Sequence, residues 1–169
     1  IRSVVAYSTA DKDTLAVQMA DQAVCIGGPE TKESYLKSKN IIMAACLTRC
    51  DAVHPGVGFL SENAGFAKAV EDAGLIFIGP RSETIALLGN KVAARKAALE
   101  AGLPITPGSK EAIADLEDAK QTAAQVGYPI ILKAAAGGGG RGMRIVRKQS
   151  ELASNLALAK KEALLFFGD

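Results

Sequence analysis

Residues 130–147 read IILKAAAGGGGRGMRIVR and decide the fold of the second half of the chain. An apolar run leads into four consecutive glycines, Gly137–Gly140, and a second apolar run follows Gly142. Each glycine weakens regular structure by about 1 kcal/mol relative to alanine, so the run predicts a loop between two strands. Successive backbone N–H groups suit an anion, and Lys133 and Arg141 flank the loop. The segment therefore predicts a loop that wraps a polyphosphate.

Two better-known glycine motifs do not fit this segment. Gly137, Gly139 and Gly142 have the spacing of a dinucleotide-binding fingerprint, which has to run from a strand into a helix. Residues 143–147 alternate like a strand, so that context fails. A Walker A loop needs Lys and then Ser or Thr after its last glycine, whereas Met143 follows here. Two interpretations remain: a flap between strands that closes over phosphates, as in protein kinases, and a solvated surface hairpin.

Basic residues gather around the predicted flap in a chain whose net charge is only +2. Lys133 lies inside an otherwise apolar run, where an ammonium group is costly unless it is paired. Arg141, Arg144 and Arg147 add positive charge after the glycines. A mobile flap that closes on a nucleotide needs this combination of flexibility and charge, which favours the phosphate-binding interpretation.

A further basic residue, Lys91, follows Asn90 at the expected start of a helix. A positive charge is unfavourable there because the helix dipole places partial positive charge at the same end. An anion held between Lys91 and the helix N-terminus would compensate. An ordinary exposed lysine is the alternative interpretation.

The first half of the chain alternates short apolar strands with helical stretches. Strands are expected at residues 4–7, 23–26, 52–54 and 75–78, and helices at residues 13–20, 40–48 and 63–73. Asn63 and Gly74 are cap signals for the last of these helices. Strands that alternate with helices predict βαβ crossovers and a parallel sheet covered on both faces. A Rossmann-like domain is therefore expected.

A change in the order of elements predicts the domain organisation. Residues 102–108 contain two prolines and two glycines and are expected to form a stiff connector. Helices are expected at 82–88, 91–101, 115–126 and 150–167, and strands at 128–134 and 143–147. The expected domains are residues 1–88, a linker with a helix at 89–108, and residues 109–169, which carry the flap.

The composition is that of an ordinary globular protein, with 49% of the 169 residues hydrophobic and 22% charged. The apolar runs are too short for a membrane span, and a net charge of +2 without Trp argues against a nucleic-acid partner. Three cysteines without a signal peptide predict free thiols in a reducing cytoplasm. The chain opens at Ile1 within a strand-like run and is expected to be part of a longer polypeptide.

Cys46, Cys50 and His54 are spaced four residues apart, as metal ligands on a helix can be. Pro55 cannot continue the helix expected to carry both cysteines, so packing of the helix face is favoured over metal binding. His54 opens a loop at 54–63 that follows an expected strand, at the edge where open α/β sheets bind ligands. A hydrogen-bonded structural histidine is favoured over a catalytic one.

Four segments occur in a characteristic order: HPGVGFLSEN at 54–63, FIGP at 77–80, GNK at 89–91 and KAAAGGGGRGM at 133–143. Together they closely resemble biotin carboxylase, the ATP-grasp component of biotin-dependent carboxylases such as acetyl-CoA carboxylase. The resemblance covers nearly the whole chain. It implies an α/β fold, with a Rossmann-like parallel-sheet N-terminal domain (pre-ATP-grasp) followed by the beginning of an ATP-grasp module with a glycine-rich lid.

The resemblance implies an enzyme, an ATP-grasp ligase that carboxylates biotin on a biotin carboxyl carrier protein. Bicarbonate would attack the γ-phosphoryl group of ATP to give carboxyphosphate and ADP, and carbon dioxide would then pass to the ureido nitrogen of biotin. This is the first half-reaction of acetyl-CoA carboxylase in fatty acid synthesis. Mg²⁺ would bridge the phosphates. Carboxyltransferase subunits, a homodimer for the full-length protein and a cytoplasmic location are also implied.

The resemblance assigns nucleotide-binding roles residue by residue. The ATP-binding residues would be Lys91, Lys133, Gly137, Gly138, Gly139, Gly140 and Met143. The glycines would close over the phosphates, and the contribution of the whole set would be positioning and charge stabilisation. The family's catalytic arginines and metal-binding glutamates lie downstream of the segment that matches, so no catalytic residue and no metal ligand is assigned within these 169 residues.

One position departs from the family pattern, and several readings of the whole protein stay open. Position 57 is usually Tyr and is associated with the biotin end of the site, whereas this chain has Val57. The alternatives are another ATP-grasp ligase of the carbamoyl-phosphate synthetase type, the biotin carboxylase domain of pyruvate or propionyl-CoA carboxylase, and a nucleotide-binding or regulatory module without chemistry of its own. Paired glutamates and a biotin-site arginine downstream would favour the carboxylase.

Overall fold

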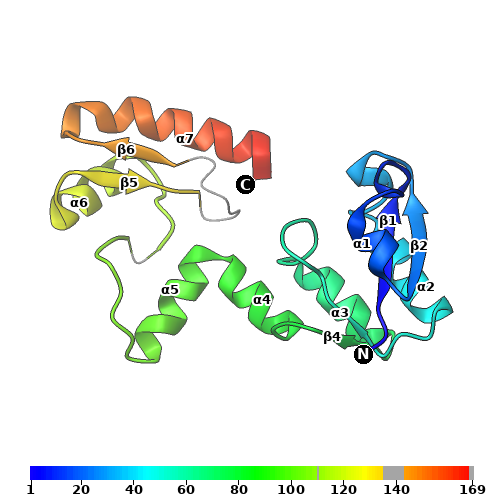
Figure 1. Ribbon diagram of the computed structural model, residues 1–169. Coiled ribbons are helices and arrows are strands. Elements are labelled where there is room, and N and C mark those ends of the chain that lie inside the picture. The colour runs from blue at the N-terminus through cyan, green and yellow to red at the C-terminus, as the bar shows by residue number, and fades with distance from the viewer. Residues whose placement is uncertain (110, 135–142, 168–169) are drawn as a thin grey trace. The chain divides into compact units, whose positions relative to one another are not determined.

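The computed structural model describes residues 1–109, 111–134 and 143–167. The chain divides into two compact units, Ile1–Ala86 and Leu87–Asp169. Both units mix helices with strands, as Figure 1 shows. No helix among the described residues is long and apolar enough to span a membrane.

The first unit is built from parallel strand pairs, as the alternation of strands and helices predicts. Strand β1 (Val4–Ser8) pairs with β2 (Gln22–Gly27), and β3 (Ala52–Val53) pairs with β4 (Ile76–Phe77). Among the described residues these four strands form two separate pairs and not one continuous sheet. The elements between the strands are η1 (Thr9–Asp11), α1 (Leu15–Met19), η2 (Thr31–Glu33), α2 (Ser38–Leu47) and α3 (Ala64–Asp72).

Helix α3 carries the core of this unit because its apolar residues recur on one side. Phe66, Ala67 and Val70 are buried, and the Phe66 ring meets Phe77 of β4 edge to face at 6.0 Å between centroids. Such aromatic pairs contribute about 0.5–1.5 kcal/mol beyond the area that they bury. Both predicted caps of α3 are confirmed. The Asn63 side chain accepts a hydrogen bond from the Phe66 N–H at 2.8 Å, and Gly74 follows the helix with φ of +76°.

Two consecutive helices follow β4. Helix α4 (Ser82–Gly89) begins where the Ser82 hydroxyl donates to Glu71 of α3 at 2.9 Å, so its first turn is tied to the first unit. Helix α5 (Lys91–Glu100) begins at the predicted cap, since Asn90 Oδ1 accepts from the N–H groups of Val92 and Ala93 at 3.0 Å each.

The second unit contains an antiparallel strand pair packed against two helices. After α5, its elements are α6 (Leu116–Val126), β5 (Ile130–Leu132), β6 (Arg144–Val146), η3 (Gln149–Glu151) and α7 (Leu152–Phe167). The antiparallel pairing of β5 with β6 confirms the predicted hairpin arrangement of these strands. Figure 1 shows α7 running alongside the two strands. Ala119, Ala123, Val146 and Leu152 form the buried core between them.

Several predicted boundaries are wrong by a few residues. The helix expected from residue 13 starts at Leu15, because residues 9–11 form a separate 3-10 turn. The helix expected to reach residue 48 ends at Leu47, where Arg49 adopts a positive φ of 55°. The strands of the hairpin are shorter than expected at both ends.

Candidate functional site

The β5–β6 hairpin has one packed face and one exposed face. Ile130, Leu132 and Val146 point toward α6 and α7 and belong to the core of the unit. Ile131 and Ile145 lie opposite each other in the strand register and are 52% and 56% exposed. Side chains alternate along a strand, so these two apolar groups share the outer face.

Lys133 and Met143 continue this outer face. Each lies two residues from an outward isoleucine, on the side of the hairpin from which the glycine run extends, and both side chains are exposed. Continuing the strand alternation one residue past β5 and β6 places these two predicted nucleotide-binding residues, a cation and a thioether, on the same side as the apolar pair. Gly137–Gly140, which carry the rest of the prediction, lie outside the described residues.

The exposed isoleucine pair was not singled out by the sequence reasoning. Its signal is present in the sequence, because Ile131 and Ile145 alternate with the inward residues of their strands. An ammonium group next to an apolar strip suits a ligand that has an anionic part and a flat apolar part. A nucleotide has both parts.

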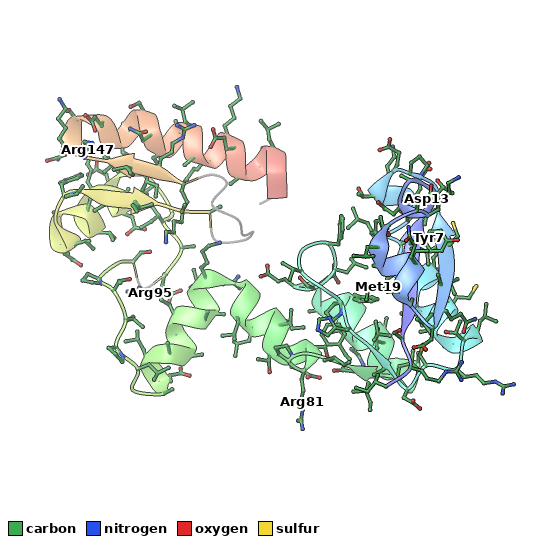
Figure 2. All side chains as sticks on the ribbon, viewed as in Figure 1. Tyr7, Asp13, Met19, Arg81, Arg95 and Arg147 are labelled. Carbon is green, nitrogen blue, oxygen red and sulfur yellow. The ribbon has the colours of Figure 1, made fainter. Side chains whose placement is uncertain are left out.

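The arginines around the hairpin play different roles from those predicted. Arg144 is on the inward side and forms an ion pair with Glu162 of α7, with both side chains about one-third exposed. Arg147 lies beyond the end of β6, at the end opposite Met143 (Figure 2), and its backbone N–H donates to Glu151 at 3.1 Å. The charge of Arg144 is therefore paired with a carboxylate of α7, and the glycines around which the cluster of positive charge was predicted lie outside the described residues.

Lys91 is the first residue of α5, as predicted, and lies on a separate element from the hairpin. Asn90 accepts hydrogen bonds from the N–H groups of Val92 and Ala93 in the first turn. The anion site between Lys91 and the helix N-terminus stays a prediction.

The loop at 54–63 leaves the carboxyl end of β3. His54 Nδ1 accepts a hydrogen bond from the Gly56 N–H at 3.0 Å, as expected for a hydrogen-bonded histidine. Gly56 and Gly58 have φ values of 70° and 79°, and Phe59 has φ of 45°. Val57, the position that departs from the family pattern, is 98% exposed at the tip.

A polar network at the end of β1 supports this loop from the side. The Tyr35 hydroxyl donates to Asp11 Oδ2 at 2.6 Å and accepts from the backbone N–H of Ser8 at 3.0 Å. The Ser8 hydroxyl also donates to Asp11 Oδ2, at 2.7 Å. Hydrogen bonds from Ser8 and Tyr35 lower the pKa of Asp11, while burial and the hydrogen bond to Asp11 raise the pKa of Tyr35. The Tyr35 ring stacks on Phe59 with centroids 5.1 Å apart.

The three cysteines are all free thiols, with Cys25 and Cys46 exposed and Cys50 half-buried. Cys46 is exposed, so the packing role predicted for it is wrong. Cys50 lies past the end of α2, packs against the core of the first unit, and has its sulfur 3.3 Å from the Thr48 hydroxyl oxygen. The described residues contain no group of three or more His, Cys, Asp or Glu side chains placed to hold a metal ion.

A parallel α/β unit followed by an antiparallel hairpin around a glycine run defines an ATP-grasp protein with a Rossmann-like N-terminal domain. The chain belongs to the biotin carboxylase family. Residues 1–85 match the family model for the biotin carboxylase N-terminal domain, and residues 90–169 match the model for the ATP-binding domain of the carbamoyl-phosphate synthase L chain.

Relatives and solved structures agree with this assignment. The chain is 47% identical over 169 residues to biotin carboxylase 1 of Bacillus subtilis, covering all of this chain and 38% of that protein. A crystal structure of the biotin carboxylase–β,γ-ATP complex from Campylobacter jejuni matches with a TM-score of 0.94 and 45% identity, over 99% of this chain and 38% of that one.

A second solved structure is the biotin carboxylase domain dimer of 2-oxoglutarate carboxylase from Hydrogenobacter thermophilus, in complex with MgADP, ADP and bicarbonate. It matches with a TM-score of 0.91 and 42% identity, over 99% of this chain and 37% of that one. The chain therefore spans little more than a third of the length of the relatives that it matches.

Proposed function

We propose that this chain is part of an enzyme that uses ATP and bicarbonate to carboxylate biotin on a carrier protein. The observation that carries the proposal is the exposed face of the β5–β6 hairpin, where Lys133 and Met143 flank the glycine run beside Ile131 and Ile145. This face occurs in a chain whose whole length aligns with biotin carboxylases.

The two parts of ATP would use different groups of this face. The Lys133 ammonium group would contact phosphate oxygens, with Gly137–Gly140 donating N–H groups above them. Ile131, Ile145 and Met143 would contact the base, because they supply apolar surface that the protein itself leaves uncovered. Lys91 would add a second charge to the phosphates. We propose the domain limits 1–88, 89–108 and 109–169 for this arrangement.

Mg²⁺ would have to be held by residues outside the hairpin. The described groups on its outer face are an ammonium, a thioether and two aliphatic side chains, and none of these is a magnesium ligand. The ATP-binding domain model and the MgADP of the Hydrogenobacter structure support Mg²⁺ as the metal of the reaction.

The chemistry assigned to these residues is binding and charge stabilisation. A bicarbonate oxygen attacks the γ-phosphorus, the bond to the β-phosphate oxygen breaks, and carboxyphosphate and ADP form. Carboxyphosphate then releases carbon dioxide and phosphate, and the deprotonated ureido nitrogen of biotin attacks the carbon dioxide. Phosphoryl transfer depends on positioning and on cations that stabilise charge on the phosphoryl oxygens, which is the part proposed for Lys133.

The partners follow from this reaction. A biotin carboxyl carrier protein would present the biotin, and carboxyltransferase subunits would consume the carboxybiotin. The dimer of the Hydrogenobacter domain supports a homodimer for the full-length protein. We propose a cytoplasmic enzyme without a membrane or nucleic-acid partner. The final carboxyl acceptor would be acetyl-CoA, and the match to a 2-oxoglutarate carboxylase domain at 42% identity favours a small keto acid as the alternative.

A carbamoyl-phosphate synthetase type of ligase is the second candidate. The match of residues 90–169 to the carbamoyl-phosphate synthase model favours it for the ATP module alone. The match of residues 1–85 to the biotin carboxylase N-terminal domain favours the carboxylase for the chain as a whole.

The test measures ATP hydrolysis by the full-length protein with bicarbonate, with and without biotin. Stimulation by biotin is expected, and hydrolysis indifferent to biotin would reject the carboxylase. Lys133→Ala should weaken nucleotide binding, whereas Lys120→Ala, which removes a lysine paired with Glu117 on α6, should not. Equal nucleotide affinity in both variants would reject the role given to Lys133.

A further inference from the structure

Phe59 holds an unusual backbone conformation in the loop that follows β3. Its φ of 45° is in the left-handed region, which residues other than glycine rarely adopt. The neighbouring Gly56 and Gly58 take similar values without penalty. A bulky residue stays in such a conformation only when its surroundings hold it there, and such residues cluster at functional sites.

The contact that holds Phe59 comes from another loop. The Phe59 ring stacks on the Tyr35 ring, with 5.1 Å between centroids and 17° between planes. Phe59 is nevertheless 58% exposed, so one part of the ring is held while the rest faces solvent. The next residue, Leu60, is buried in the core and fixes the far end of the loop.

Tyr35 is itself held more firmly than a surface tyrosine. Its hydroxyl bridges Asp11 and the backbone of Ser8, at the carboxyl end of β1. Ser8 is buried and donates its own hydroxyl to the same Asp11 oxygen. The ring therefore extends from a closed polar network to Phe59, and connects the end of β1 with the loop after β3.

We infer that Tyr35 is a positioning residue for the loop at residues 54–63, which faces biotin. Through its stack on Phe59, Tyr35 sets the conformation in which Val57 and the exposed part of the Phe59 ring meet the substrate. The inference rests on the proposed function, in which biotin is a substrate, and on the family resemblance, which associates position 57 with the biotin end of the site. Both loops lie at the carboxyl ends of parallel strands, the edge where open α/β sheets bind ligands. Tyr35 does not touch substrate and acts only through Phe59.

The experiment compares three variants of the full-length protein. Tyr35→Leu removes the ring stack and both hydroxyl bonds, whereas Tyr35→Phe keeps the stack. Tyr7→Phe is the matched control, because Tyr7 lies on β1 (Figure 2) outside this network. The two readouts are hydrogen exchange of the backbone at 54–60 and the KM values for free biotin and for ATP.

Tyr35→Leu should speed exchange at 54–60 and raise the KM for biotin about three- to tenfold, the range expected from losing one aromatic pair. The KM for ATP should stay within about twofold, a split that a general loss of stability would not produce. Tyr35→Phe should restore most of the biotin KM, and Tyr7→Phe should change neither readout.

Each failure has a separate meaning. Unchanged exchange at 54–60 in Tyr35→Leu would overturn the inference whatever the activity. Faster exchange with an unchanged biotin KM would also overturn it, because the loop would then be irrelevant to biotin. A wild-type enzyme without biotin dependence would instead reject the proposed function, and the exchange data would still test the positioning of the loop. If Tyr35→Leu does not fold, Asp11→Ala replaces it, since that change removes the acceptor that holds the Tyr35 hydroxyl and leaves the Phe59 ring in place.

Discussion

Replacing Ile131 with alanine should weaken ATP binding by more than an equally exposed apolar residue elsewhere on the unit does. Full burial of an isoleucine side chain contributes about 1.5–3 kcal/mol. Ile131 is 52% exposed without ligand. Covering that remaining half with a base would therefore contribute about 0.8–1.5 kcal/mol to binding. The loss corresponds to a Kd for ATP raised about four- to thirteenfold.

The loss of folding stability is expected to be of similar size, about 0.7–1.4 kcal/mol, because the fold already covers the other half of this side chain. Ile131 also lies opposite Ile145 in the strand register on the exposed face, and such pairs contribute about 0.2–1 kcal/mol. Calorimetric titration of the full-length protein with ATP, in the absence of bicarbonate, gives the Kd, and thermal unfolding gives the stability. Leu158→Ala is the matched control, because Leu158 is about equally exposed on α7. An ATP affinity unchanged in Ile131→Ala, or reduced as much by Leu158→Ala, would refute the assignment of this face to the base.

Three further predictions concern the fold. Asn63→Ala should lower the free energy of unfolding by about 1 kcal/mol, because it removes the cap of α3, whereas Asn63→Asp should leave it nearly unchanged. Equal losses in the two variants on urea unfolding would contradict this role of Asn63. Leu152→Ala should cost about 2–5 kcal/mol since Leu152 is fully buried beneath the hairpin, and a loss below about 1 kcal/mol on thermal unfolding would show a looser core. The lowered pKa of Asp11 stabilises the folded state above the ordinary value of 3.8, and that stabilisation disappears as pH falls through the lower folded pKa. In Asp11→Asn, the free energy of unfolding should therefore fall less steeply as the pH drops below 3.8. The same pH dependence in the variant as in the unmutated protein would argue against the network of Asp11, Ser8 and Tyr35.

Features fixed by neighbouring residues could be read from the sequence. Asn63 and Asn90 are caps because a short acceptor side chain reaches N–H groups two or three residues further on. The strands at 130–132 and 144–146 were predicted, with wider bounds, from their apolar residues. The glycine-rich sequence between them predicts no crossover helix, and strands joined without a crossover pair antiparallel, as β5 and β6 do. The motif at 54–63 and the glycine run together identified the family.

Features that depend on distant partners could not be read in the same way. Arg144 pairs with Glu162, 18 residues further along the chain, and the residues next to Arg144 do not predict this partner. Tyr35 meets Asp11 and Phe59 through backbone turns that only the folded chain defines. The end of α2 depends on the positive φ of Arg49, a conformation that arginine itself does not favour.

The most direct test of the proposed function follows labelled carbon from bicarbonate. The full-length protein is incubated with ATP, Mg²⁺, isotopically labelled bicarbonate and free biotin, and both carboxybiotin and ADP are measured. We predict that labelled carboxybiotin forms in step with ADP, and that both fall sharply in Lys133→Ala. Formation of ADP without any label on biotin would contradict the assignment of this chain to a biotin-carboxylating enzyme.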